Sequence, residues 1–180
     1  NTTGLRLLAP RSVIIGLAVG GFTGNGIFAG ADEVVVSRCH AGVGLSGTTA
    51  NPNGGSGIVV QGGLACFVDR CVASGNAVAG IEVAGPGTGD TKVTGCKLGT
   101  NAAGTAGLAN GTGLLAGVDS GVIFVGGPSA AERCLISGNT THGVTAVAGS
   151  GVTLAGCYVG VDATGATALP NGGDGVNAQE

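Results

Sequence analysis

Short runs of alternating hydrophobic residues, separated by glycine, asparagine and serine, dominate the pattern of this chain. Representative runs are Val34–Val36, Ile58–Val60 and Val152–Leu154. Runs of this length that contain β-branched residues and are bounded by turn formers predict short β-strands. No stretch combines helix caps with a 3.6-residue period, so we expect essentially no helix.

These predicted strands follow a repeat. Glycine followed by an aliphatic residue recurs at intervals of 22 to 33 residues. The pairs are Gly4-Leu5, Gly26-Ile27, Gly57-Ile58, Gly80-Ile81, Gly113-Leu114, Gly143-Val144 and Gly175-Val176. Repeats of this length, with about three strands in each, predict a parallel solenoid with six coils and the start of a seventh.

A cysteine marks a second position in five of the coils, 13 to 21 residues after the opening glycine. The five residues are Cys39, Cys71, Cys96, Cys134 and Cys157, and Leu17 takes this place in the first coil. An aliphatic residue follows each cysteine two positions later, so we expect the cysteines to point inward and stack as a ladder. Parallel Cβ directions favour a reduced column. One or two disulfides between adjacent coils are the alternative.

Every second coil ends in a long, polar segment. Gly99–Thr112 and Gly160–Asp174 are close copies, and Gly42–Ser56 is a looser one. The larger unit is therefore two coils, and we expect the three loops to project in register from one corner. In the third loop, Asp162, Thr164, Asn171 and Asp174 are the candidate residues of a loop binding surface.

The segments Cys157–Val176 and Lys97–Thr105 resemble the repeat of secreted, surface-associated right-handed β-helix proteins of the pectate-lyase-like superfold, which reads roughly N-x-I-G-T-D-x-T-G-T-x-x-L-x-N-G-x-x-G-V. Phe124–Asn139 resembles the family's I-G-G…N-V-I-S-G-N half-unit. The likeness is good from Gly57 onward and loose before it. It implies one all-β, right-handed parallel β-helix domain over residues 1–180, in an extracellular or cell-surface protein.

The chain departs from this repeat at the cysteine ladder, where the family has asparagine. Stacked asparagine side chains hydrogen-bond along a ladder. We expect stacked cysteines only to pack as small apolar groups or to pair as disulfides.

The composition of the chain argues against several classes of protein and partner. Glycine makes up 40 of 180 residues, yet 43% of the chain is hydrophobic, which argues against both collagen and disorder. A net charge of −3 without a basic run argues against a nucleic-acid partner. The longest apolar stretch, Ser12–Phe22, is too short and too glycine-rich to span a membrane. Because the chain opens at Asn1 without a signal peptide, we expect a processed or excised fragment of a longer solenoid.

The candidate chemistry is sparse. The ten carboxylates scatter within the repeat, whereas lyases and hydrolases on such folds need a cluster, so we expect no catalytic residue. His40 is the only histidine beside a ladder cysteine, and we expect neither a metal nor a cofactor. Arg38 and Arg70, with Asp69 nearby, are expected to form a solvated face.

Two asparagines at predicted turns, Asn110 and Asn139, stand in sequons. They are candidate glycosylation sites if the source is a glycosylating eukaryote, because an acceptor asparagine has to be exposed.

The functional hypothesis is a non-catalytic structural or adhesive module of an extracellular, cell-surface or fibrous assembly. The alternatives are a carbohydrate-active enzyme whose site lies outside this segment, and a module that binds polysaccharide through the long loops. A solenoid needs caps, and the pattern shows none at either end. We therefore expect both ends to pair with further β-helix coils, from the same polypeptide or from a neighbouring copy stacked end to end.

Overall fold

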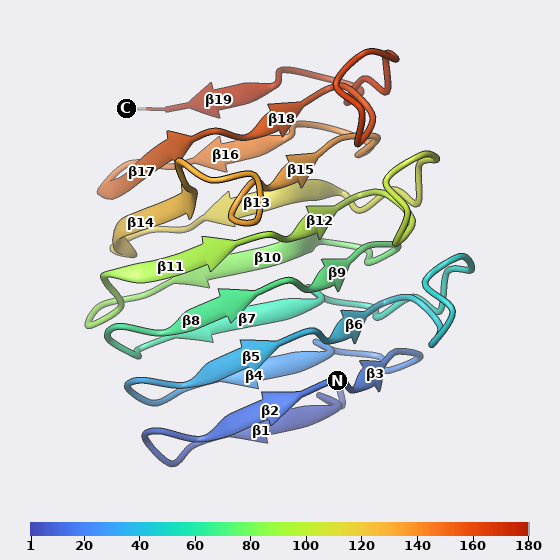
Figure 1. Cartoon of the computed structure of the whole chain (residues 1–180). Coiled ribbons are helices and arrows are strands. Elements are labelled where there is room, and N and C mark those ends of the chain that lie inside the picture. Colours follow the sequence, from blue (N-terminus) through green and yellow to red (C-terminus); the bar gives the residue numbers. More distant parts are fainter. Residues whose placement is uncertain (180) are drawn as a thin grey trace.

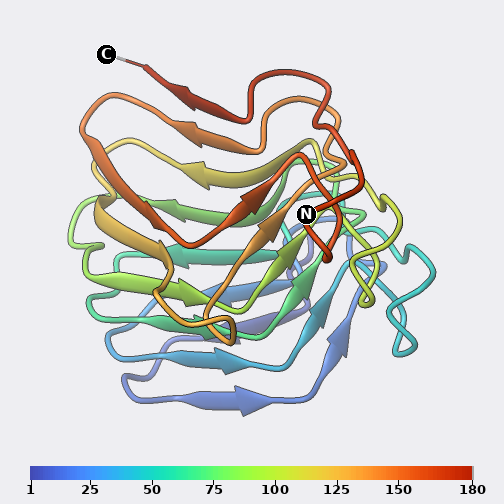
Figure 2. The ribbon, with the colours of Figure 1, turned by 45° about the horizontal axis from the view of Figure 1, so that its top comes forward.

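The computed structural model describes residues 1–179 as a rod of stacked coils with three parallel sheets (Figures 1 and 2). Sheet A contains β1 (Leu5–Leu7), β4 (Ile27–Ala29), β7 (Ile58–Gln61), β10 (Ala79–Ala84), β13 (Thr112–Ala116), β16 (Val144–Ala146) and β19 (Val176–Ala178). Sheet B contains β2 (Val13–Ile15), β5 (Val35–Ser37), β8 (Phe67–Asp69), β11 (Thr91–Thr94), β14 (Gly121–Gly126) and β17 (Ser150–Ala155). Sheet C contains β3 (Ala18–Val19), β6 (His40–Ala41), β9 (Val72–Ala73), β12 (Lys97–Leu98), β15 (Leu135–Ile136) and β18 (Tyr158–Val159).

The register of sheet A confirms the predicted repeat. The aliphatic residues that open the coils pair with one another from strand to strand: Leu5, Ile27, Ile58, Ile81, Leu114, Val144 and Val176. Six coils and the first strand of a seventh follow. Residues 1–179 contain no helix, and hence none that could cross a membrane.

The core is a set of such columns between the three sheets. Ile27, Ile58, Ile81 and Leu114 are all completely buried in the sheet A column. Full burial of one such side chain contributes about 1.5–3 kcal/mol, and identical spacing lets each residue contact the next along the axis. The narrow interior explains why valine, isoleucine, alanine and cysteine replace aromatic residues in the core.

A column of asparagines lies inside the turn that leads from sheet C to sheet A. Its members are Asn53, Asn76, Asn110, Asn139 and Asn171. The Nδ2 atoms of the first four members each donate to the Oδ1 of the next at 2.9–3.1 Å. All five also donate to a backbone carbonyl. We call this set the amide ladder. It satisfies polar groups that the tightly stacked turns would otherwise bury without partners.

The amide ladder corrects the expectation that two sequon asparagines are exposed. Asn110 is 1% exposed and Asn139 is 3% exposed, and the side-chain amide of each bonds to its neighbours in the ladder. A glycan cannot be attached to these nitrogens in the folded protein. The physical reason is that a turn in a solenoid is covered by the coils above and below it.

The three long loops project from one side of the rod, as predicted (Figure 1, in cyan, yellow-green and red). Gly47 O accepts a 2.9 Å bond from Ala102 N, and Gly104 O accepts one from Ala163 N, so successive loops touch in register. Each loop also closes with the same antiparallel bridge, Val43 to Ala50, Thr100 to Gly107 and Val161 to Ala168. The first loop is therefore a full structural copy, although its sequence is the loosest.

Candidate functional site at the corner between sheets B and C

Sheets B and C meet at a two-residue turn in five of the six coils. The turns are Gly16-Leu17, Arg38-Cys39, Arg70-Cys71, Gly95-Cys96 and Gly156-Cys157. The first residue of each turn has a left-handed conformation, with φ between 50° and 73°. This conformation costs a non-glycine residue about 1–2 kcal/mol. It sends the side chains of Arg38 and Arg70 outward and the following cysteine inward.

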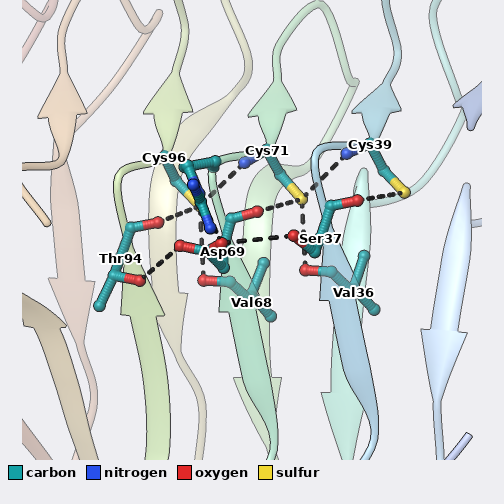
Figure 3. A network of polar contacts seen from close by, with 9 residues as sticks. Val36, Ser37, Cys39, Val68, Asp69, Cys71, Thr94 and Cys96 are labelled. Carbon is teal, nitrogen blue, oxygen red and sulfur yellow. Dashed lines mark hydrogen bonds and ion pairs between the residues drawn. The ribbon is translucent and has the colours of Figure 1, made fainter. Parts of the chain in front are cut away.

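The structure places four of the five cysteines in a buried column and the last one, Cys157, half-buried at the end of the column. Cys39 N donates to Cys71 Sγ at 3.4 Å, and Cys71 N donates to Cys96 Sγ at the same distance (Figure 3). The thiols of Cys39 and Cys96 each lie 3.3 Å from the carbonyl two residues earlier. Sulfur thus makes weak hydrogen bonds as donor and acceptor, where we expected apolar packing or disulfides only.

All six cysteines are free thiols, and their acidity differs along the column. Hydrogen bonds from the neighbouring thiols lower the pKa of Cys71 and of Cys134. Burial in the core raises the pKa of Cys96 well above that of an exposed thiol, and it also raises the pKa of Cys66. A thiol with a raised pKa carries little thiolate at neutral pH, so it is a poor nucleophile. Cys96 and Cys66 are therefore core-packing residues rather than nucleophiles.

On the outer side of the same corner, Asp69 is the centre of a hydrogen-bond network between three coils (Figure 3). Its side chain is only 10% exposed. Oδ1 accepts from Thr94 at 2.9 Å, and Oδ2 accepts from Ser37 at 3.3 Å and from Arg70 Nε at 2.7 Å. The expected solvated face is therefore wrong for Asp69, because a nearly buried carboxylate has to be paired and hydrogen-bonded.

The fifth coil departs from this two-residue turn with an insertion, Gly127–Arg133, which we call the corner loop. Figure 1 shows it leaving β14 toward the coil below. Gly95 N donates to Glu132 O at 2.8 Å, which fixes the loop to that coil. Inside the loop, the Glu132 carboxylate accepts from Ser129 N at 3.1 Å and from Ser129 Oγ at 2.7 Å. These bonds lower the pKa of Glu132 and keep the loop compact.

A hollow lies on each side of the corner loop. The larger has a volume of about 700 Å³, and its lining includes Phe67, Lys92, Phe124, Asp90 and Glu132. Lys92 pairs in register with Phe67 on one side and Phe124 on the other. Aromatic side chains therefore flank a cation on the outer face of sheet B.

The smaller hollow has a volume of about 270 Å³ and lies against sheet C. Its lining includes Gly95, Lys97, Arg133 and Tyr158. The Arg133 guanidinium lies 4.3 Å from the centre of the Tyr158 ring. The corner loop and the two hollows beside it thus lie together on the outer side of this corner.

The protein family described as "Right handed beta helix region" matches residues 25–178 of the chain. The chain belongs to the right-handed β-helix family. Neither the curated proteins nor the solved structures contain a significant match. The family assignment therefore gives this β-helix its fold and its handedness, and the site has to be interpreted from its own residues.

The β-helix does not bring the four predicted loop residues together as one surface. Asn171 belongs to the amide ladder, and Asp162 is only 8% exposed, with its carboxylate bonded within the loop. Thr164 and Asp174 are exposed. Asp174 Oδ2 instead accepts from Asn177 at 3.1 Å and lies 3.5 Å from His142 Nδ1. Two of the four candidates are thus structural residues.

The corner loop and its hollows were not predicted. Their signal was the distance from the opening glycine to the ladder cysteine, which is 21 residues in the fifth coil and 13 to 16 in the others. Within residues 1–179, no three histidine, cysteine or acidic side chains are grouped in a way that could hold a metal ion.

The acidity of Asp162 predicts how the third loop responds to pH. Asp162 Oδ1 accepts from Thr164 Oγ1 at 2.6 Å and from Thr167 N at 3.3 Å, and these bonds lower its pKa to about 2. Because the folded pKa is lowered, this contribution to stability is complete above the ordinary value of 3.8 and disappears as the pH falls through about 2. We expect the NMR amide signals of Thr164 and Thr167 to stay constant down to about pH 3 and to shift near pH 2. A titration midpoint near pH 4 would contradict this.

Proposed function

We propose that this β-helix is a structural module of an extracellular or cell-surface assembly, in which further β-helix coils stack on its ends. The extracellular setting rests on the resemblance of its repeat to secreted proteins. The stacking rests on one observation, the exposure of core columns at the two end coils.

The exposure of the residues in the core columns rises sharply at the ends of the rod. Val144 is 0% exposed, whereas Val176, the next residue in the same column, is 48% exposed. At the other end, Leu17 is 42% exposed, although the next residue in its column, Cys39, is 0% exposed. Ile14, Leu154 and Val159 are likewise only partly buried.

Another coil would bury these residues and would pair the open backbone edges of β1 and β19. Burial of apolar surface and pairing of strand edges both favour such stacking. A top-to-bottom contact between copies uses two different surfaces, so it continues into a filament rather than closing as a dimer. The sides of the rod would remain free.

Sedimentation velocity at increasing protein concentration tests this proposal. We expect the protein to associate reversibly, and Val176→Lys to weaken association at least about tenfold, because a lysine would be buried without a partner. Val122→Lys is the matched control, since Val122 is 45% exposed on the side of the rod. A monomer at all concentrations, or equal effects of the two substitutions, would refute end stacking.

A further inference from the structure

The larger hollow lies over the outer face of β11. Thr91 and Val93 of this strand are completely buried, whereas Lys92 between them is exposed. Because side chains alternate along a strand, Asp90 and Thr94 face outward on the same side as Lys92. All three of these outward residues line the hollow, so β11 forms its floor.

Aromatic side chains form two walls of this hollow. Phe67 and Phe124 pair in register with Lys92 from either side, so their backbones are about 10 Å apart at the usual strand spacing. Phe124 is 39% exposed and Phe67 is partly buried. Pro128 of the corner loop adds a further apolar surface. These walls favour a ligand with apolar side chains.

The corner loop closes the hollow on the side of sheet C and brings a carboxylate to it. Gly127 and Glu132 both line the hollow. A Cβ atom at Gly127 would lie 2.7 Å from the carboxyl carbon of Glu132, so the carboxylate lies directly over the loop backbone. Both hydrogen bonds from Ser129 reach its Oε2, and Oε1 has no partner within residues 1–179. The insertion thus supplies an acceptor that is held in place and still open to a ligand.

The charges around the hollow are of both signs and are not paired with one another. In the described part of the chain, the side chains of Lys92 and Asp90 make neither an ion pair nor a hydrogen bond, and Glu132 makes no ion pair. A ligand with only negative charge would meet two carboxylates, and a ligand with only positive charge would meet the ammonium group of Lys92. A zwitterion satisfies both kinds of charge.

We propose that the larger hollow binds a short apolar peptide with two free ends, its carboxylate on Lys92 and its ammonium group on Glu132. The side chains of the peptide pack against Phe67 and Phe124. The volume of about 700 Å³ lies in the usual range of small-ligand sites, and it admits a dipeptide. Asp90, at the other end of the floor, disfavours peptides with acidic side chains. This inference does not depend on end stacking.

NMR titration of the 180-residue chain at low ionic strength tests the proposal, with the amide signals of Lys92 and Phe124 as reporters. The probes are the dipeptide leucyl-phenylalanine, its N-acetyl form, which lacks the ammonium group, and its C-terminal amide, which lacks the carboxylate. The test variants are Lys92→Gln and Glu132→Gln. Lys97→Gln is the matched control, because it removes the same charge from a residue that lines the smaller hollow instead. Circular dichroism checks that all three variants fold.

We expect the dipeptide to bind with a Kd of about 1 mM or tighter, and each blocked form about threefold or more weakly than that. Lys92→Gln should bind the dipeptide and its amide equally, and Glu132→Gln should bind the dipeptide and its N-acetyl form equally. Lys97→Gln should keep both preferences.

Three results would overturn the proposal. The first is the absence of saturable shifts at Lys92 and Phe124. The second is a blocked form that binds the unaltered protein as tightly as the dipeptide does, because the hollow would then be a site for simple cations or simple anions. The third is a loss of both preferences in Lys97→Gln. None of these results depends on the outcome of sedimentation.

Discussion

Replacing Asn110 with alanine is expected to destabilise the β-helix by about 3–5 kcal/mol, because several buried polar groups lose their partners at once. Asn110 Oδ1 accepts from the backbone and the side chain of Asn76, each at 3.0 Å. Its Nδ2 donates to Ala73 O at 2.9 Å and to Asn139 Oδ1 at 3.1 Å. Alanine would remove these four hydrogen bonds from a turn that is 1% exposed at this position, where water cannot replace them. Urea unfolding followed by circular dichroism measures the loss.

Asn171→Ala is the matched control for this prediction. Asn171 is the last member of the amide ladder, is partly exposed, and bonds to one ladder neighbour only, Asn139. Water can replace its hydrogen bonds, so we expect a loss of about 1–2 kcal/mol. Equal losses at the two positions, or a loss below about 1 kcal/mol for Asn110→Ala, would show that the ladder is not a main source of stability.

Replacing Gly99 with alanine is expected to cost about 3–5 kcal/mol, because two penalties add. Gly99 has a φ of 94°, which an alanine adopts only with strain. A Cβ atom there would also overlap Asn139 Oδ1 and would lie 2.5 Å from Ser137 O. The clash would push apart the turn that carries the amide ladder. The free energy of unfolding in urea is again the measurement.

Gly160 provides the internal control, because it takes the same place in the third loop that Gly99 takes in the second. Its φ is 75°, but a Cβ atom would meet only Pro170 Cα, at 4.0 Å. Gly160→Ala should therefore lose only the conformational part, about 1–2 kcal/mol. If the two alanine variants were equally stable, the close packing around Gly99 would make no contribution to the free energy of unfolding.

The coils could be predicted from the sequence because their period is a direct consequence of strand register. Stacked strands place equivalent residues one above another, so Ile58 and Ile81 had to recur at coil intervals. The position of the ladder cysteines follows from the same constraint. The repeat in the sequence and the contacts between coils therefore follow from the same strand register.

The amide ladder was missed although its residues stand three or four positions before each coil start, as Asn110 does before Gly113. Asparagine in a turn is usually exposed, and nothing in a single turn shows that other turns cover it. The identification of a buried amide requires knowledge of which turns stack. The same reason accounts for the mistaken sequons at Asn110 and Asn139.

The B–C corner could not be predicted because its residues come from different coils. Arg70 and Arg133 are far apart in sequence, and Phe67, Lys92 and Phe124 meet only through strand pairing. Charged residues that are scattered along the sequence lie in a row in the folded protein. The long distance from Gly113 to Cys134 in the fifth coil was the only local sign of the corner loop.

Hydrogen exchange of the end strands at different protein concentrations tests end stacking most directly. We expect the amides of β1 and β19 to exchange quickly at low concentration and to become protected as the concentration rises. The amides of β10, in the middle of sheet A, should stay protected throughout. Exchange in β1 and β19 that is fast and independent of concentration would contradict the account, because it would mean that the open ends of the β-helix do not accept further coils.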